Sequence, residues 1–214
     1  MNRDELRAAV DAAHERGQKV RAHVIWRDEI RAALDAGVDL IDHGDEMDEE
    51  LLTTMGEKGT WWVPSMGLLK WFVEIEQGDG REYGYVLPAE NARRDFDNLC
   101  RMLRVANETG INVVPGDDFG LGPLAHAVGV YAKELTVYVN EVGIKPIDVI
   151  RWATRNAGLL YGGTTGVVEP GKLADLVVYE RDPSSDITLL ERPNEELQAV
   201  MIGGQFVVDR LGDR

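Results

Sequence analysis

The sequence predicts an α/β protein whose strands run parallel. Short β-branched apolar runs alternate with amphipathic helical segments, and a glycine closes each of the first three helices. A chain that repeats strand, helix and strand forms parallel βα units with right-handed crossovers. Two of the four histidines, His23 and His43, each stand at the end of one of these apolar runs. We therefore expect a parallel sheet that carries histidines where two successive strands end.

The N-terminal half holds the regular part of this pattern. Asn2 and Glu5 have the spacing of a capping box, which predicts a helix that runs to Gly17. The expected elements that follow are strand 19–24, helix 26–37, strand 38–44, helix 47–59, strand 60–66, an irregular stretch 67–87, helix 88–110 and a fourth strand 111–118.

The C-terminal part changes in character. Residues 132–143 and 145–162 have helical patterns, whereas residues 166–183 and 197–210 are β segments broken by Pro-Gly and Gly-Gly turns. We expect a small β element at this end of the chain.

Composition excludes several classes of protein. The net charge is −15, and the sequence holds no basic stripe, so a nucleic-acid backbone would be repelled. No apolar stretch approaches the roughly 20 residues that span a bilayer, and the N-terminus has a charged helical pattern. Cys100 has no second cysteine to pair with and occupies a helical position. We expect a cytoplasmic protein with a buried, inert Cys100, and neither a nucleic acid nor a membrane as partner.

The carboxyl ends of the predicted strands hold the candidate chemistry. His23, His43 and the pair Asp117–Asp118 all come where a strand ends, and the carboxyl ends of parallel strands meet at one edge of a sheet. Imidazole and carboxylate groups that converge from several strands suit a divalent transition metal. The alternative interpretation is structural, with each histidine hydrogen-bonded to a neighbouring loop and the aspartates capping a turn. Because side chains alternate along a strand, only one of the two aspartates is expected to face the site.

Three segments carry a family resemblance. "AHVIWRDEIRAALDAGVDLIDHG", "VVPGDDFG" and "ATRNAGLLYGGTTGVVEPGKLADLVVYERDP" resemble the amidohydrolase superfamily, in particular its imidazolonepropionase-like and prolidase-like branch. The first is similar to strands five and six of that family's barrel, the second to the strand-eight motif, and the third to the return into a small β-sandwich domain. The third is the most specific segment, although it is structural.

The resemblance implies a metal-dependent hydrolase that cleaves amide or cyclic amide C–N bonds. It makes His23 and His43 ligands of one metal of the family's centre, which holds one or two divalent ions, most simply zinc, and it makes Asp118 both a ligand and the general base. Asp117 stands where the family has Thr or Ser, and it would be the base if the register were shifted by one residue. His126 would contact a small amide substrate, or else be an ordinary loop histidine.

The resemblance also shows what the chain lacks. The family's His-x-His motif of strand one and its strand-four lysine or glutamate have no counterpart here. We therefore expect an α/β fold that is the C-terminal half of a TIM-type (β/α)8 barrel, strands five to eight, over residues 1–163, and part of a small β-sandwich domain over residues 164–214. Such a half would need the missing N-terminal half, on another chain or in a longer gene, or a second copy of the chain. The alternative is a non-catalytic half-barrel module.

Overall fold

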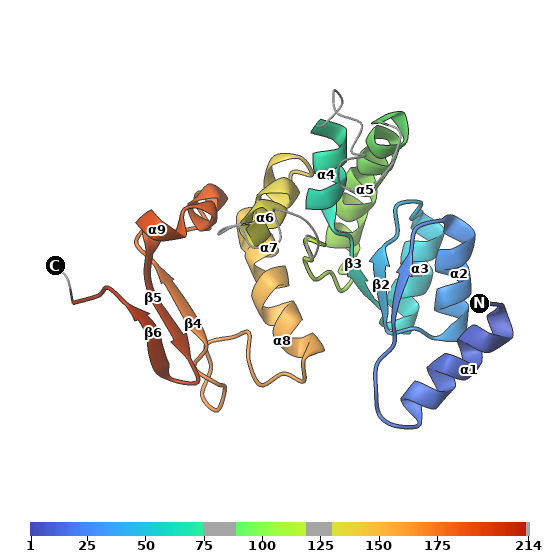
Figure 1. Ribbon diagram of the computed structural model, residues 1–214, viewed down its shortest axis with the longest axis horizontal. Coiled ribbons are helices and arrows are strands. Elements are labelled where there is room, and N and C mark those ends of the chain that lie inside the picture. Colours follow the sequence, from blue (N-terminus) through green and yellow to red (C-terminus); the bar gives the residue numbers. More distant parts are fainter. Residues whose placement is uncertain (75–88, 119–129, 213–214) are drawn as a thin grey trace. The chain divides into compact units, whose positions relative to one another are not determined.

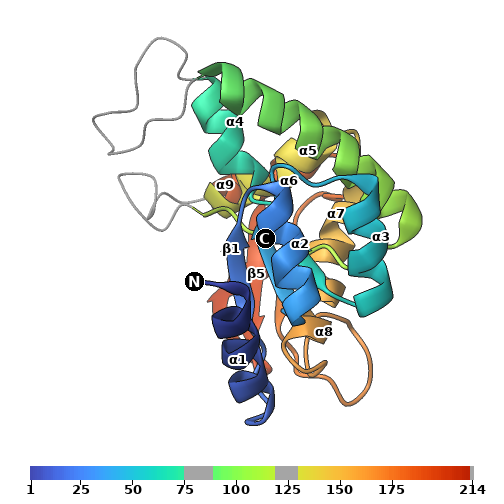
Figure 2. The same cartoon turned by 90° about the vertical axis from the view of Figure 1, so that its right-hand side faces the viewer.

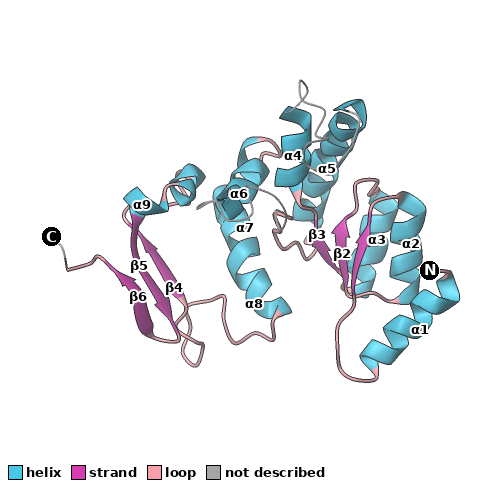
Figure 3. Cartoon of the chain, in the orientation of Figure 1, coloured by secondary structure: helices cyan, strands magenta, loops and turns pink. Residues whose placement is uncertain are grey.

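The fold is that of a computed structural model, which describes residues 1–74, 89–118 and 130–212. The chain divides into two compact units, Met1–Asp118 and Phe119–Arg214. Figure 1 labels their elements and Figure 3 colours them by secondary structure. The predicted boundary at residue 163, between half-barrel and small β domain, stays a prediction.

The first unit follows the predicted βα order. Its elements are α1 (Arg3–His14), β1 (Arg21–Val24), α2 (Arg27–Ala36), β2 (Leu40–His43), α3 (Glu49–Lys58), β3 (Trp61–Val63), α4 (Met66–Glu74) and α5 (Ala89–Thr109). The Asn2–Glu5 capping box forms in both directions, and Gly37 ends α2 in the left-handed conformation. Sequence patterns of capping and periodicity therefore located these helices closely.

The three strands form a parallel sheet in the order β1-β2-β3. In this register His23 is the partner of Asp42, and Val24 is the partner of His43. Helices α2 and α3 cover one face of the sheet (Figure 1), and apolar side chains fill the space between. The fully buried members of this core include Ile30, Leu34, Ile41, Leu51, Met55 and Trp62. Because side chains alternate along a strand, the burial of these residues against the helices turns the residues between them toward the opposite face of the sheet.

Two sequence-based predictions in this unit were wrong. The stretch expected to be irregular begins with the regular helix α4, where Lys70 and Glu74 form an ion pair of 2.9 Å one helical turn apart. Trp71 and Phe72 therefore lie on a helix and not in a loop. Figure 2 shows α4 alongside α5. The remainder of that stretch, residues 75–88, lies outside the described residues.

The predicted fourth strand, 111–118, is reduced to a single parallel bridge between Val113 and Trp62. Trp62 N–H donates to Asn112 O and Val114 N–H donates to Trp62 O, at 2.8 and 2.9 Å. The segment therefore lies beside β3 as expected. Pro115 lacks an N–H, and the segment leaves extended geometry soon after the bridge, so the pairing does not continue to Asp118.

The second unit has helices followed by a small antiparallel sheet. Its elements are α6 (Val130–Asn140), α7 (Pro146–Arg151), the π-helix η2 (Trp152–Asn156), α8 (Ala157–Leu160), β4 (Leu176–Tyr179), the 3₁₀ helix η3 (Ile187–Glu191), α9 (Pro193–Glu196), β5 (Leu197–Ile202) and β6 (Gln205–Asp209). The strands pair in the order β4-β5-β6, so the small β element that the sequence predicted is present.

Two further expectations can be compared with the structure. Cys100 is buried in α5, as its helical setting predicted. None of the helices in the described part of the chain combines the length and the apolar character that crossing a bilayer requires.

Candidate functional site

The two strand-end histidines lie against each other. His23 comes from β1 and His43 is the last residue of β2, and their ring centroids are 4.4 Å apart with an edge-to-face angle of 66°. The pairing of β1 with β2 produces this contact, since it brings two residues twenty positions apart to the same edge of the sheet. The sequence predicted both residues, and the structure brings them together.

Asp118 completes a cluster of three side chains. Its Oδ2 lies 3.7 Å from His43 Nε2, and its side chain is half exposed. Asp118 belongs to the segment that runs beside β3, so the cluster draws on β1, on β2 and on the segment across β3. The expectation that strand alternation separates Asp117 from Asp118 was wrong, because neither residue lies in a strand. The choice of Asp118 rests instead on its distance from His43.

Backbone conformation marks the same edge of the sheet. Three described non-glycine residues have positive φ angles: His43 (64°), Ser65 (53°) and Asp118 (53°). Each follows or ends a parallel strand or bridge, and residues with side chains rarely adopt this conformation without surrounding contacts that hold them there. For His43 one such contact is the hydrogen bond of 2.7 Å that Trp62 Nε1–H donates to its carbonyl oxygen. Strain of this kind clusters at functional sites.

The surroundings of His43 favour its neutral form. Burial lowers the pKa of His43, and the neighbouring His23 lowers it further, while Asp118 and Asp42 act in the opposite direction. A neutral imidazole has a free lone pair, which is the form in which histidine binds a metal or accepts a proton.

Sequence reasoning missed an ion pair beneath the histidines. Asp42 is buried in the middle of β2, and its Oδ2 accepts a hydrogen bond of 2.5 Å from Arg21 Nε. Its other oxygen, Oδ1, is buried and has no hydrogen-bond partner among the residues that the structure describes. The signal was present in "LIDHG", where a carboxylate interrupts an otherwise apolar strand.

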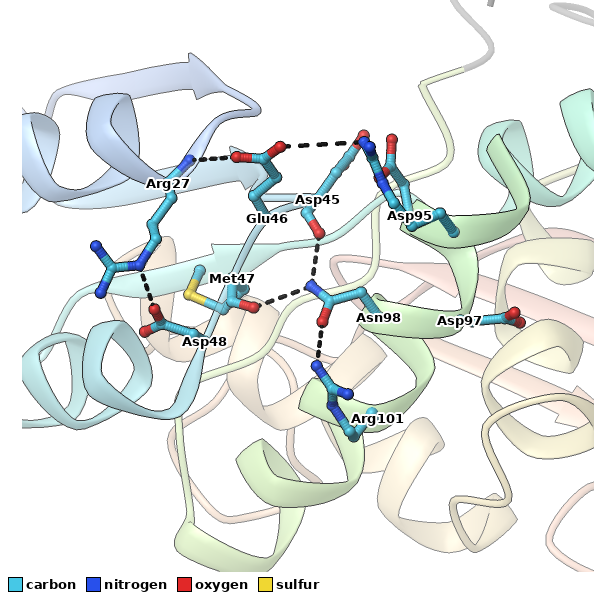
Figure 4. A pocket seen from close by; sticks show the side chains of 10 residues that line it. Arg27, Asp45, Glu46, Met47, Asp48, Asp95, Asp97, Asn98 and Arg101 are labelled. Atoms are coloured by element: carbon cyan, nitrogen blue, oxygen red, sulfur yellow. Dashed lines mark hydrogen bonds and ion pairs between the residues drawn. The ribbon is translucent and has the colours of Figure 1, made fainter. Parts of the chain in front are cut away.

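A hollow of about 600 Å³ opens beside the loop that follows β2 (Figure 4). Its lining comes from the start of α2, from this loop and from α5, and consists of Arg27, Asp45, Glu46, Met47, Asp48, Arg94, Asp95, Asp97, Asn98 and Arg101. Burial raises the pKa of Asp45 to about 7, with smaller contributions from Asp95 and Glu46. Charged groups of both signs line the hollow, so no single class of ligand follows from it.

Asn98 fixes this loop from the side of α5. Its Nδ2 donates to the carbonyl oxygens of Asp45 and Met47, at 2.7 and 2.9 Å (Figure 4). The loop begins directly after His43, so this clamp lies close along the chain to the histidine pair. Sequence analysis had no signal for it, because Asn98 stands in an ordinary helical pattern.

The cluster has the nitrogen and oxygen donors of a metal site, but its three side chains do not converge on a common position for an ion. Across residues 1–74, 89–118 and 130–212, no group of three or more His, Cys, Asp or Glu side chains is arranged to hold a metal ion. His23 and His43 supply nitrogen donors and Asp118 an oxygen donor, a mixture that zinc accepts. His126, the fourth predicted site residue, lies outside the described residues.

Comparison with known proteins places the chain in a family. The family model described as "Amidohydrolase family" matches residues 1–207. Ochratoxinase of Aspergillus niger is 30% identical over 195 residues, which are 89% of this chain and 38% of that protein. An uncharacterized protein of Mycobacterium tuberculosis is 29% identical over 195 residues and is covered to 49%. The chain thus spans about half the length, or less, of the curated relatives it matches.

Solved structures give the same result. The crystal structure of A. niger ochratoxinase matches with a TM-score of 0.82 and 26% identity, over 98% of this chain and 46% of that one. A Xaa-Pro dipeptidase with methionine bound in its active site matches with a TM-score of 0.80 and 28% identity, over 97% and 49%. The α/β fold of this chain therefore corresponds to about half of these proteins.

Proposed function

The chain belongs to the amidohydrolase family, and we propose that it forms part of a metal-dependent hydrolase that cleaves amide or cyclic amide C–N bonds. The observation that carries this proposal is the cluster of His23 and His43, near the carboxyl ends of the adjacent parallel strands β1 and β2, with Asp118, from the segment that runs beside β3. Enzymes with parallel barrel strands place their active sites at that end.

The donor set fits a divalent metal, most simply zinc. Two imidazoles in contact and a carboxylate 3.7 Å from one of them are nitrogen and oxygen donors of the kinds that zinc accepts. The half-exposed Asp118 leaves that position open to solvent and to a substrate. His23 and His43 would bind the ion through ring nitrogens, and Asp118 through a carboxylate oxygen.

A divalent ion bound there would supply Lewis-acid chemistry, which activates water and polarises a substrate carbonyl. The roles of the chain's own residues follow from their chemistry. Asp118 accepts the proton at a carboxylate oxygen and returns it to the leaving nitrogen, as a general base and then a general acid. His23 and His43 hold the ion in place, and the hydrogen bond from Trp62 to the His43 carbonyl keeps that histidine at the edge of the sheet.

The names of similar proteins support an amide substrate. One is an ochratoxinase and another a Xaa-Pro dipeptidase. We propose a small amide for this chain, with His126 as a substrate contact. We also propose that the protein acts in the cytoplasm.

The active assembly is proposed to contain a further βα half. In this interpretation residues 1–163 supply strands five to eight of a TIM-type barrel, and residues 164–214 supply part of a small β-sandwich domain. Two observations support it: the relatives are about twice as long, and β1 has a hydrogen-bonded neighbour on one side only among the described strands. The missing half would come from another chain, from the rest of a longer gene or from a second copy of this chain.

Light scattering after size-exclusion chromatography tests this requirement. Expressed alone, the chain should associate, and its amidase activity with added zinc should be feeble. A monodisperse 23.8 kDa species that turns over substrate at ordinary enzyme rates would contradict it.

Zinc binding tests the site itself. Wild-type protein should bind zinc, and the double variant His23→Ala/His43→Ala should lose it, because two of three proposed ligands are removed. His14→Ala is the matched control, since His14 lies on α1 and pairs with Asp39 instead. Zinc content unchanged in the double variant would refute the ligand assignment, and absence of zinc from the wild type would favour a non-catalytic half-barrel module.

A further inference from the structure

The free oxygen of Asp42 is the feature of the site that the proposed function leaves unexplained. Asp42 is 9% exposed, and its Oδ2 is held by Arg21 Nε at 2.5 Å. Its Oδ1 is buried, and none of the described residues forms a hydrogen bond with it. A buried carboxylate oxygen without a partner costs about 1–3 kcal/mol or more, so native proteins rarely keep one without a reason. Among the described side chains it is the one buried polar group left in this state.

His23 is the nearest candidate donor by register. Asp42 and His23 are partners across the parallel pair β1–β2, and partners in adjacent strands direct their side chains to the same face of the sheet. Neighbouring strands lie about 4.8 Å apart, which places two facing side chains within reach of each other. Arg21, two residues before His23, lies on this face too and fixes the other oxygen of Asp42.

His23 has a ring nitrogen to spare. Its ring packs edge-to-face against the His43 ring, and the residue is exposed. A histidine that binds a metal uses one ring nitrogen, and the other usually donates its N–H to a carboxylate or carbonyl oxygen. That second hydrogen bond fixes the tautomer and the direction of the ring.

We propose that Asp42 is a positioning residue of the metal site, whose Oδ1 accepts the N–H of the His23 ring nitrogen that does not face the ion. This inference rests on the proposed function. Arg21 occupies Oδ2, which leaves Oδ1 as the oxygen available to His23. The charge in the middle of an apolar strand is then explained by the histidine beside it.

Zinc titration of the full chain with three variants tests the proposal. Asp42→Asn should bind zinc about 10–100-fold more weakly, the loss typical of a carboxylate that orients a metal-binding histidine. Arg21→Met removes the other half of the ion pair but keeps the acceptor, and it also removes a positive charge, so its zinc affinity should be unchanged or tighter. Asp39→Asn removes a carboxylate at the start of β2, where it pairs with His14, and should leave zinc affinity as in the wild type.

A second measurement observes the proposed hydrogen bond directly. When zinc is added to the wild type, nuclear magnetic resonance of the histidine rings should show a slowly exchanging N–H proton on the unbound nitrogen of His23. Asp42→Asn should weaken or abolish that signal, which a loss of negative charge alone would leave in place.

The outcomes separate the two proposals. If the wild type binds zinc but Asp42→Asn binds it equally well, or the His23 N–H exchanges freely, the role of Asp42 is wrong while the metal site stands. Equal losses of zinc affinity in Asp42→Asn and Arg21→Met would assign the pair to strand stability and overturn the proposal. A wild type that binds no zinc overturns both.

Discussion

His43 Nε2 lies 3.7 Å from Asp118 Oδ2, although the two residues come from segments far apart in the sequence. Both have positive φ angles, 64° and 53°, at the carboxyl edge of one sheet. Two strained residues with complementary groups in contact are unusual in a purely structural loop. This pair therefore anchors the proposed site.

Asp118 should matter far more than Asp117. Asp118→Asn should lower turnover of the active assembly by at least about 10²–10⁴-fold, the typical contribution of a general base, and should weaken zinc binding as well. Asp117→Asn is the matched control, because it makes the same change at the neighbouring position. Steady-state kinetics and zinc titration on both variants measure this. A larger loss at Asp117 would assign the base to that residue.

Gly116 controls the position of Asp118. A Cβ at residue 116 would lie 2.5 Å from Val63 Cγ1, and Val63 is buried in β3, so one of the two must move. Gly116→Ala should lower the free energy of unfolding by about 1–3 kcal/mol, as overpacking does, and weaken zinc binding by displacing Asp118. Chemical denaturation and zinc titration measure the two effects. Gly212→Ala is the control, since a Cβ at that residue meets nothing within 4 Å; equal behaviour of the two variants would show that the segment yields freely.

Asn98 should hold the loop after β2. Asn98→Asp keeps the oxygen that accepts from Arg101 Nη2 but loses both N–H groups that bind the Asp45 and Met47 carbonyls. The free energy of unfolding should fall by about 1–3 kcal/mol, because two carbonyls lose their donor. Arg101→Ala removes only the outer hydrogen bond and should change stability little. Urea denaturation of both variants decides the point, and similar midpoints for the two would argue against a clamp.

Asp39 should make stability depend on pH. Partial burial opposes its charged form, but the Val20 N–H, at 2.7 Å, and the His14 ring, at 2.9 Å, outweigh this and lower the pKa of Asp39. A carboxyl whose pKa is lowered by folding stabilises the protein above its ordinary pKa of 3.8, and this contribution is lost as the pH falls through the lowered value.

Asp39→Asn should therefore be less stable than the wild type near neutral pH, by about 1 kcal/mol. The difference should shrink at acid pH, where wild-type Asp39 is protonated as well. Thermal unfolding of both proteins at several pH values tests this. A stability difference that stays constant down to acid pH would mean that the charge of Asp39 is not involved.

The sequence by itself determined the βα order of the first unit. Capping at Asn2 and Glu5, the left-handed stop at Gly37 and the alternation of apolar periods are local features, and local features are encoded within a few residues. The same patterns predicted that His23 and His43 end their strands. They did not predict α4, because its largely apolar sequence was not recognised as a helical pattern.

Tertiary structure alone decided how these elements make a site. The contact of His23 with His43 at 4.4 Å depends on the register of β1 against β2, which no local pattern specifies. Asp118 lies close to His43 although it is not part of a strand, because the chain turns after the bridge at Val113. The unpartnered oxygen of Asp42 appears only once burial and neighbours are known. Distances between residues remote in sequence follow from the packing of the whole sheet. These distances decide which side chains can act together in one site.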